Sequence, residues 1–141
     1  WYGFAGLVIL VSWQQIGYMM IIYIAGLQSI PGDVMEAAAI DGASGFQRLF
    51  KVTIPMMMPS ITICTFLSVV NGFKLFDQNL SLTAGEPAKM SEMLALNIYN
   101  TFYGRAGWEG VGQAKAVIFF ALVIIIGMFQ LRATRSKEVQ Q

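Results

Sequence analysis

The chain has 141 residues, of which 56% are hydrophobic and only 12% are charged. Soluble domains carry about 25% charged residues, so this composition places the chain in a lipid bilayer. The net charge of +1 excludes the basic surface of a nucleic-acid-binding protein. There is no His, and the single cysteine, Cys64, lies in an apolar run. An intrachain disulfide and the usual Cys/His metal sites are therefore excluded.

The start of the chain is already hydrophobic. It begins at Trp1 rather than Met, and its first charged residue is Asp33. A secretory signal would show a basic start and a small-residue cleavage site, and neither is present. We therefore expect the chain to be the C-terminal part of a longer protein whose first spans precede it.

Three segments lack charged residues for long enough to cross a membrane, namely 1–32, 52–73 and 116–131. A spanning helix needs about 20 mostly apolar residues, which the first two provide. The third lengthens outward if the Lys115 ammonium snorkels to the interface and residues 111–114 join the helix. The sequence thus predicts an all-α polytopic membrane protein with three transmembrane helices, forming one transmembrane domain over residues 1–141.

The basic residues predict the orientation, because cytoplasmic loops are rich in Lys and Arg. The connector between the first two spans and the C-terminal tail carry most of them: Arg48, Lys51, Arg132, Arg135 and Lys137. We therefore expect both in the cytoplasm and the loop 77–110 outside. Within that loop, residues 87–103 favour a short amphipathic helix. Four glycines are expected to break it before the last span: Gly104, Gly107, Gly110 and Gly112.

The connector 31–55 predicts a compact helix–turn–helix. Asp33 is in position to cap a first helix, with Glu36 reaching back to the cap. The alanines that follow favour helix, and Gly42 suits the left-handed position that ends it. Ser44 and Gln47 form a second capping box, and the helix after them is expected to end before Pro55.

Small residues at 37–39 would let another protein approach the helix backbone, and Glu36 and Asp41 offer carboxylates to a basic partner. Spacing alone leaves a second interpretation open, in which the acids only cap and the alanines only favour helix.

The same connector resembles a known family. Glu36-Ala37-Ala38, followed by Gly42 and by an ending from Val52 to Pro55, matches the EAA loop of ABC importer permeases. Val52 and Ile54 are aliphatic departures from the usual Ile-x-Leu-Pro ending. The Asp-Gly-Ala variant at 41–43 is similar to the sugar branch, of the maltose and multiple-sugar type. The resemblance continues through the stretches 71–73, 82–87 and 94–95 and covers essentially all of the chain.

This resemblance implies that the connector docks on a separate ATP-binding cassette ATPase. Glu36 would pair with a basic group there, and Gly42 would set the angle between the two coupling helices. The implied coupling residues are Glu36, Ala37, Ala38, Asp41, Gly42, Phe50 and Pro55. The chain has no phosphate-loop motif of its own, so ATP and Mg²⁺ would be bound by the ATPase and no cofactor is expected here. Other implied partners are a second permease subunit and an extracytoplasmic solute-binding protein, at a bacterial plasma membrane.

Polar residues within the first two spans predict a solute path, because polar groups facing lipid are costly. Asn71, in a stretch that matches the family near the path, is the first candidate. Amides bond sugar hydroxyls, and aromatic faces pack on sugar rings. The remaining candidates are Ser68, Trp13, Gln14, Tyr18 and Phe73. Each of them could instead bond a neighbouring helix, and Thr62 and Thr65 could bond their own helix carbonyls.

Two alternatives to a sugar permease stay open. One is a related permease for glycerol phosphate or a polyamine. Against a phosphate-bearing solute, Lys74 at the outer end of the second span is the only basic candidate for the path. The other is a three-span scaffold that recruits a soluble partner, which would have no need of polar residues in its spans. An intramembrane enzyme is disfavoured because His is absent and Asp77 has no acidic partner in a span.

Overall fold

The computed structural model describes residues 2–135, so Trp1 and the predicted cytoplasmic Lys137 lie outside the described residues. The described residues form helices and contain no strand, which confirms the all-α prediction. The chain divides into two compact units. The first comprises residues 1–15 and 68–128, and the second comprises residues 16–67 and 129–141.

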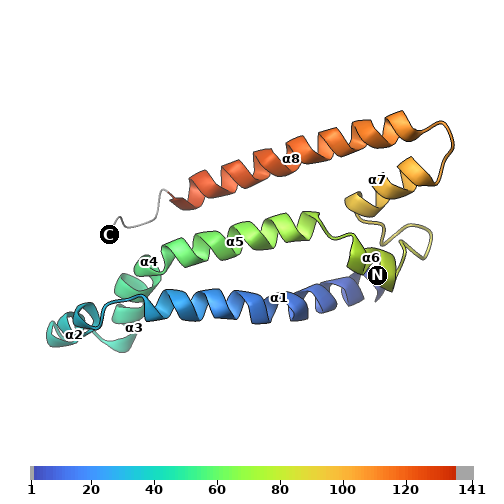
Figure 1. Ribbon diagram of the computed structural model, residues 1–141. Helices are drawn as coiled ribbons and strands as arrows, with labels where there is room; N and C mark the ends of the chain where they lie inside the picture. The colour runs from blue at the N-terminus through green and yellow to red at the C-terminus, as the bar shows by residue number, and fades with distance from the viewer. Residues whose placement is uncertain (1, 136–141) are drawn as a thin grey trace. The chain divides into compact units, whose positions relative to one another are not determined.

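Two helices are each long and apolar enough to cross a membrane (Figure 1). They are α1 (Tyr2–Gln28) and α8 (Glu109–Arg135), with 27 residues apiece. At 1.5 Å per residue each extends about 40 Å, more than the hydrocarbon core requires. Helix α8 contains the predicted third span together with residues 111–114. Its last turn carries Arg132 and Arg135, which complement the negative end of the helix dipole.

The second predicted span, 52–73, is not one straight helix. Helix α5 (Met58–Phe73) has 16 residues, about 24 Å, and the helical segment Gly45–Met56 before it is bent away by 65°. Pro59 occupies the second position of α5, where its missing N–H costs no intrahelical bond, so a new helix starts there. The described residues thus hold two straight candidate spans, and three if the bent pair is one span.

The segment before this bend corrects a second expectation, because the helix does not end before Pro55. It runs as α3 (Gly45–Arg48), a π-helical turn η1 (Leu49–Thr53) and α4 (Ile54–Met56). The N–H of Ile54 donates to the carbonyl of Leu49, five residues back, in the wider π pattern. This turn ends at Thr53, two residues before Pro55, which has no N–H to donate, and the chain stays helical through the proline.

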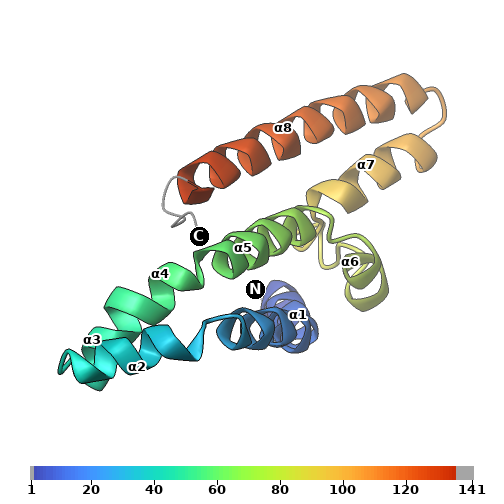
Figure 2. The same cartoon turned by 60° about the vertical axis from the view of Figure 1, so that its left-hand side comes forward.

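In the second unit, α3 lies beside α2 (Gly32–Ile40), and both follow the C-terminal end of α1 (Figures 1 and 2). Helix α1 contacts α5 closely at Gly26, where an added β-carbon would lie 2.9 Å from the Cβ of Ser60. Small residues at such a crossing let two membrane helices approach. Cys64 is buried on α5, with its Sγ 4.0 Å from the carbonyl oxygen of Met19 on α1, as expected of a packing residue.

The first unit contains α6 (Asp77–Leu82) beside the start of α1, and α7 (Leu94–Tyr103) antiparallel to the start of α8 (Figures 1 and 2). The predicted amphipathic helix therefore begins at Leu94 rather than near residue 87. Residues 83–93 instead form a turn in which Ala84, Ala88 and Lys89 have positive φ. Leu96 of α7 and Asn79 of α6 are fully buried.

Two of the four glycines expected to separate α7 from the last span lie inside α8. They are Gly110 and Gly112. A β-carbon at Gly112 would lie 2.8 Å from the Cβ of Phe102, so the backbones of α7 and α8 meet there. Gly112 thus serves helix packing and does not break the chain, a role that only the folded arrangement reveals.

Candidate functional site

The connector 31–55 folds as the helix–turn–helix that its sequence predicts. Gly42 has φ +75°, the left-handed conformation that ends α2. The N–H of Ala43 donates to the carbonyl of Ala38 at 3.1 Å and closes the turn. Ser44 then caps α3. Its Oγ accepts from the N–H of Gln47 at 3.4 Å, and its own N–H donates to Gln47 Oε1 at 2.8 Å. Both predictions are confirmed.

The start of the connector differs from prediction. Helix α2 begins at Gly32 with Pro31 at the cap position, and no side chain bonds the helix end. Asp33 lies two positions past the cap residue and so cannot cap the helix. Its carboxylate instead sits in the first turn, where negative charge is favoured by the helix dipole. Glu36 therefore makes no capping box and is exposed.

The surface of this connector is largely uncovered. No residue of α2 is buried, and Glu36, Ala37, Asp41, Gly42 and Phe50 are all exposed. Three large apolar side chains of the connector are mostly exposed. Their exposed fractions are 86% for Ile40, 78% for Phe46 and 61% for Phe50. Ala38 and Pro55 are half-buried. Apolar side chains gathered with two carboxylates on one short motif are typical of a protein-docking surface.

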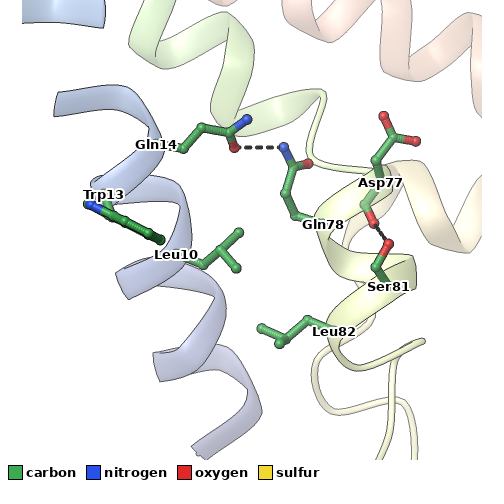
Figure 3. Close-up of a pocket in the computed structure, with 7 residues that line it drawn as sticks. All are labelled: Leu10, Trp13, Gln14, Asp77, Gln78, Ser81 and Leu82. Atoms are coloured by element: carbon green, nitrogen blue, oxygen red, sulfur yellow. Dashed lines mark hydrogen bonds between the residues drawn. The ribbon is translucent and has the colours of Figure 1, made fainter. Parts of the chain in front are cut away.

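The polar residues of the spans form two hydrogen-bonded pairs within the first unit. Asn71 Nδ2 of α5 donates to Gln15 Oε1 of α1 at 3.4 Å. Gln78 Nε2 of α6 donates to Gln14 Oε1 of α1 at 2.9 Å. Figure 3 shows Gln14 and Gln78 facing each other between the two helices, with Leu10 and Leu82 facing each other farther along.

An open groove of about 550 Å³ lies along this second pair. Its wall combines two amides, a hydroxyl, a carboxylate and an indole ring. Ser81 Oγ is held by the carbonyl of Asp77 at 2.7 Å, whereas Trp13 is 80% exposed. The lining residues are Leu10, Trp13, Gln14, Asp77, Gln78, Ser81 and Leu82. Amides and carboxylates beside an aromatic ring can bond hydroxyl groups and cover an apolar face.

The other predicted path residues are not drawn into these pairs. Ser68 is exposed, and Tyr18 belongs to the second unit, where its side chain is more than half exposed. Phe73 packs edge-on against Phe119 of α8, with ring centroids 6.4 Å apart. Thr62 and Thr65 bond the carbonyls of Met58 and Ile61, at 2.9 and 2.7 Å, which confirms the local alternative for both.

Gln78 and a charged network farther along the chain were not predicted from the sequence. Gln78 lies in the polar run 77–79, a few residues after the second span, and that run was the available signal. Lys115 was expected to snorkel, but its Nζ donates to Asn97 Oδ1 and Thr101 Oγ1 of α7, each at 2.8 Å. A neighbouring helix therefore satisfies this ammonium.

Glu92 completes that network just before α7. Its carboxylate accepts from Asn97 Nδ2 at 2.9 Å and from Asn100 Nδ2 at 2.6 Å. Partial desolvation acts to raise the pKa of Glu92. The two amide donors, together with the charges of Lys89 and Lys115, outweigh it and lower this pKa below its usual value. The carboxylate is therefore ionised at neutral pH.

Comparison with known proteins shows the family to which this chain belongs. Residues 1–137 match the family described as binding-protein-dependent transport system inner membrane component. The chain belongs to this family. The match runs through the connector and through all the helices described above.

Three curated relatives illustrate the range of this transport family. The chain is 50% identical over 138 residues to a probable starch degradation products transport system permease protein of Thermoanaerobacterium thermosulfurigenes, covering 98% of this chain and 47% of the relative. It is 35% identical over 127 residues to a multiple sugar-binding transport system permease protein of Streptococcus mutans, covering 90% and 43%. It is 38% identical over 129 residues to an sn-glycerol-3-phosphate transport system permease protein of Brucella abortus, covering 89% and 43%. The chain thus spans less than half the length of these relatives.

Proposed function

We propose that this chain is part of the membrane-spanning permease subunit of an ATP-driven, binding-protein-dependent sugar importer. The single observation that carries this proposal is the exposed connector 31–55, whose fold and sequence combine the EAA motif with an uncovered apolar and acidic surface. The family membership and the sugar-related names of two relatives support it.

In this proposal the connector is the coupling site for a cytoplasmic ATPase. Glu36 and Asp41 supply carboxylates for basic groups of the ATPase, and the exposed ring of Phe50 supplies apolar contact area. The left-handed Gly42 and the Ser44 cap hold the two short helices at a fixed angle. A rigid connector can pass the closure of an ATPase dimer to the spans, because it moves as a body rather than deforming.

The proposed topology places the connector and the C-terminal end of α8 in the cytoplasm and the loop 77–110 outside. The outer loop would then face the solute-binding protein, and a second permease subunit would complete the path. ATP and Mg²⁺ belong to the ATPase, and this chain supplies neither a nucleotide site nor catalysis in the proposal.

The solute path is assigned to the polar residues of α1, α5 and α6. Asn71 and Gln14 are the first candidates for contact with the solute, because both belong to hydrogen-bonded amide pairs between helices. Ser68, Trp13, Tyr18 and Phe73 complete the proposed set. Amides that bond each other can exchange those bonds for bonds to sugar hydroxyls at little net cost. The spans 1–32 and 52–73 contain no Lys or Arg, and Lys74 at the outer end of the second is the only basic candidate for the path, which favours a neutral solute.

A second candidate solute is glycerol phosphate, which one relative's name supports. Competition separates the two. Uptake of a labelled malto-oligosaccharide by cells carrying the full-length permease and its partners should be blocked by unlabelled sugar but not by glycerol 3-phosphate. Inhibition by glycerol 3-phosphate alone would reassign the solute while leaving the coupling mechanism intact.

The coupling assignment is tested by crosslinking in the full-length permease. Single cysteines are placed at Ala38 and Ala39 after Cys64→Ala, and crosslinks to the cognate ATPase are measured with and without ATP and vanadate. Crosslinks that change with nucleotide are expected. A cysteine at Met128, on the apolar α8, serves as the control and should not crosslink. No crosslink from a labelled, well-expressed protein would favour the scaffold interpretation.

A further inference from the structure

The hairpin of α7 and α8 contains a continuous chain of charged and amide groups across the outer loop. Lys115 lies on α8 within the candidate span Glu109–Arg135, six residues from its start. Its ammonium donates to Asn97 and Thr101, which are one turn apart on α7 and share a face. Both acceptors are side-chain oxygens aimed at the same cation.

Asn97 joins this cation to an anion. The amide oxygen of Asn97 accepts from Lys115, while its Nδ2 donates to Glu92. The second carboxylate oxygen of Glu92 accepts from Asn100 at 2.6 Å. One positive and one negative charge are thus linked through a single amide whose orientation both of them determine. The opposite charges of Glu92 and Lys115 compensate each other in this network, and side-chain oxygens of α7 satisfy the hydrogen-bonding needs of the ammonium.

Close packing surrounds the network. Gly112 lets the backbone of α8 reach Phe102, and Leu96 of α7 is fully buried. Upstream, Met93 donates its N–H to Asn79 Oδ1 at 2.8 Å, so the residue after Glu92 is fixed to α6. The segment from α6 through the turn 83–93 to α8 is therefore connected by side-chain bonds at each step.

We propose that Glu92, Asn97 and Lys115 form a charge-compensated latch, which holds α7 on the start of α8 and makes the outer loop part of the rigid membrane framework. An ionisable residue in a span is retained only where partners satisfy it, and here those partners come from α7. The latch explains why a ten-residue helix stays in place beside a span. It does not depend on which solute is carried.

Hydrogen–deuterium exchange on the full-length permease in lipid nanodiscs tests this latch. Lys115→Met and Glu92→Gln should each speed exchange of the α7 amides about tenfold or more, since each removes a charged hydrogen-bond partner. Lys115→Arg, which keeps the cation, should stay closer to the parent protein. Lys89→Met is the matched control, because Lys89 acts on Glu92 through its charge and not through the hydrogen bonds of the network, and it should change α7 exchange far less than Lys115→Met does.

Unchanged α7 exchange in Lys115→Met would overturn the latch. If that variant fails to insert, Thr101→Val carries the test, because it removes one acceptor at nearly constant volume and constant charge; unchanged exchange there would also overturn the proposal. The double variant Glu92→Gln with Lys115→Met should fall short of the product of the two single effects, and full multiplication would show two independent sites. Solute uptake measured in parallel reports on the proposed function separately.

Discussion

Gly26 of α1 lies directly against Ser60 of α5, so that a β-carbon on Gly26 would meet the Ser60 Cβ at 2.9 Å. No such crowding exists at Gly17 on the same helix, where a β-carbon would find nothing within 4 Å. The same substitution at the two positions therefore distinguishes the effect of close packing from the effect of helix propensity. This comparison gives the first prediction.

Gly26→Ala should destabilise the permease by about 1–3 kcal/mol, because an overpacked contact pushes the two helices apart. Gly17→Ala should be neutral or slightly stabilising, because alanine favours helix. Thermal unfolding of the purified full-length protein in detergent measures both. Adding Ser60→Ala, which removes the Oγ nearest to the new methyl, should recover part of the loss. Equal stability of the two alanine variants would show that α1 and α5 do not meet at Gly26.

Gly42 carries the second prediction. At φ +75° a side chain costs about 1–2 kcal/mol, so Gly42→Ala should loosen the turn between α2 and α3. Crosslinking of a cysteine at Ala38 to the ATPase should fall, and ATP hydrolysis should become less dependent on solute. Gly45→Ala, where an added β-carbon meets nothing within 4 Å, is the control and should couple normally. Normal coupling in Gly42→Ala would mean that the angle between the helices is not needed.

Asn79 holds the turn 83–93 from within the core of the first unit. Its Nδ2 donates to the carbonyl of Ser91 at 2.7 Å, and its Oδ1 accepts from the N–H of Met93. Asn79→Leu leaves both backbone groups without this partner and should cost at least about 2 kcal/mol. Ser81→Ala on the same helix should change stability by less than about 0.5 kcal/mol. Denaturant titration followed by limited proteolysis of the turn 83–93 compares them; equal protection in the two variants would contradict the prediction.

Protonation of Glu92 gives a prediction on pH. Its pKa is lowered from the ordinary value of 4.5, so the folded protein holds the carboxylate more strongly ionised than the unfolded chain does. The stabilisation is therefore present above pH 4.5 and is lost as the pH falls through the lower, folded-state pKa. Protection of the α7 amides, corrected for intrinsic exchange, should be constant near neutral pH and decline only under acid conditions. Glu92→Gln should abolish this dependence, and a decline that begins above pH 5 would assign it to another group.

Several features of this protein follow from neighbouring residues and were predictable. Apolar runs of sufficient length gave α1 and α8, because lipid requires a backbone that satisfies itself. The Ser44–Gln47 cap and the left-handed Gly42 depend on contacts within about four residues, so the sequence pattern determines them. The EAA connector was recognisable for the same reason, since its signal is a contiguous motif. The predicted start of α2 was wrong by two residues, because Pro31 and Asp33 both suit the beginning of a helix and the sequence pattern does not choose between them.

The remaining features depend on residues that are far apart in the chain. Gln14 and Gln78 are separated by 64 positions, and Lys115 finds its partners 14 and 18 positions away. A lysine near the end of an apolar run is equally consistent with an ammonium that snorkels to the interface and with one that bonds a neighbouring helix. The sequence does not show which helix lies beside it. The bend at Met57 likewise depends on the combined effect of the π-helical turn, Pro55 and Pro59 on the direction of the helix axis. Local chemistry determined where the helices form, and the tertiary structure decided which polar groups meet, because those bonds exist only once the helices have packed.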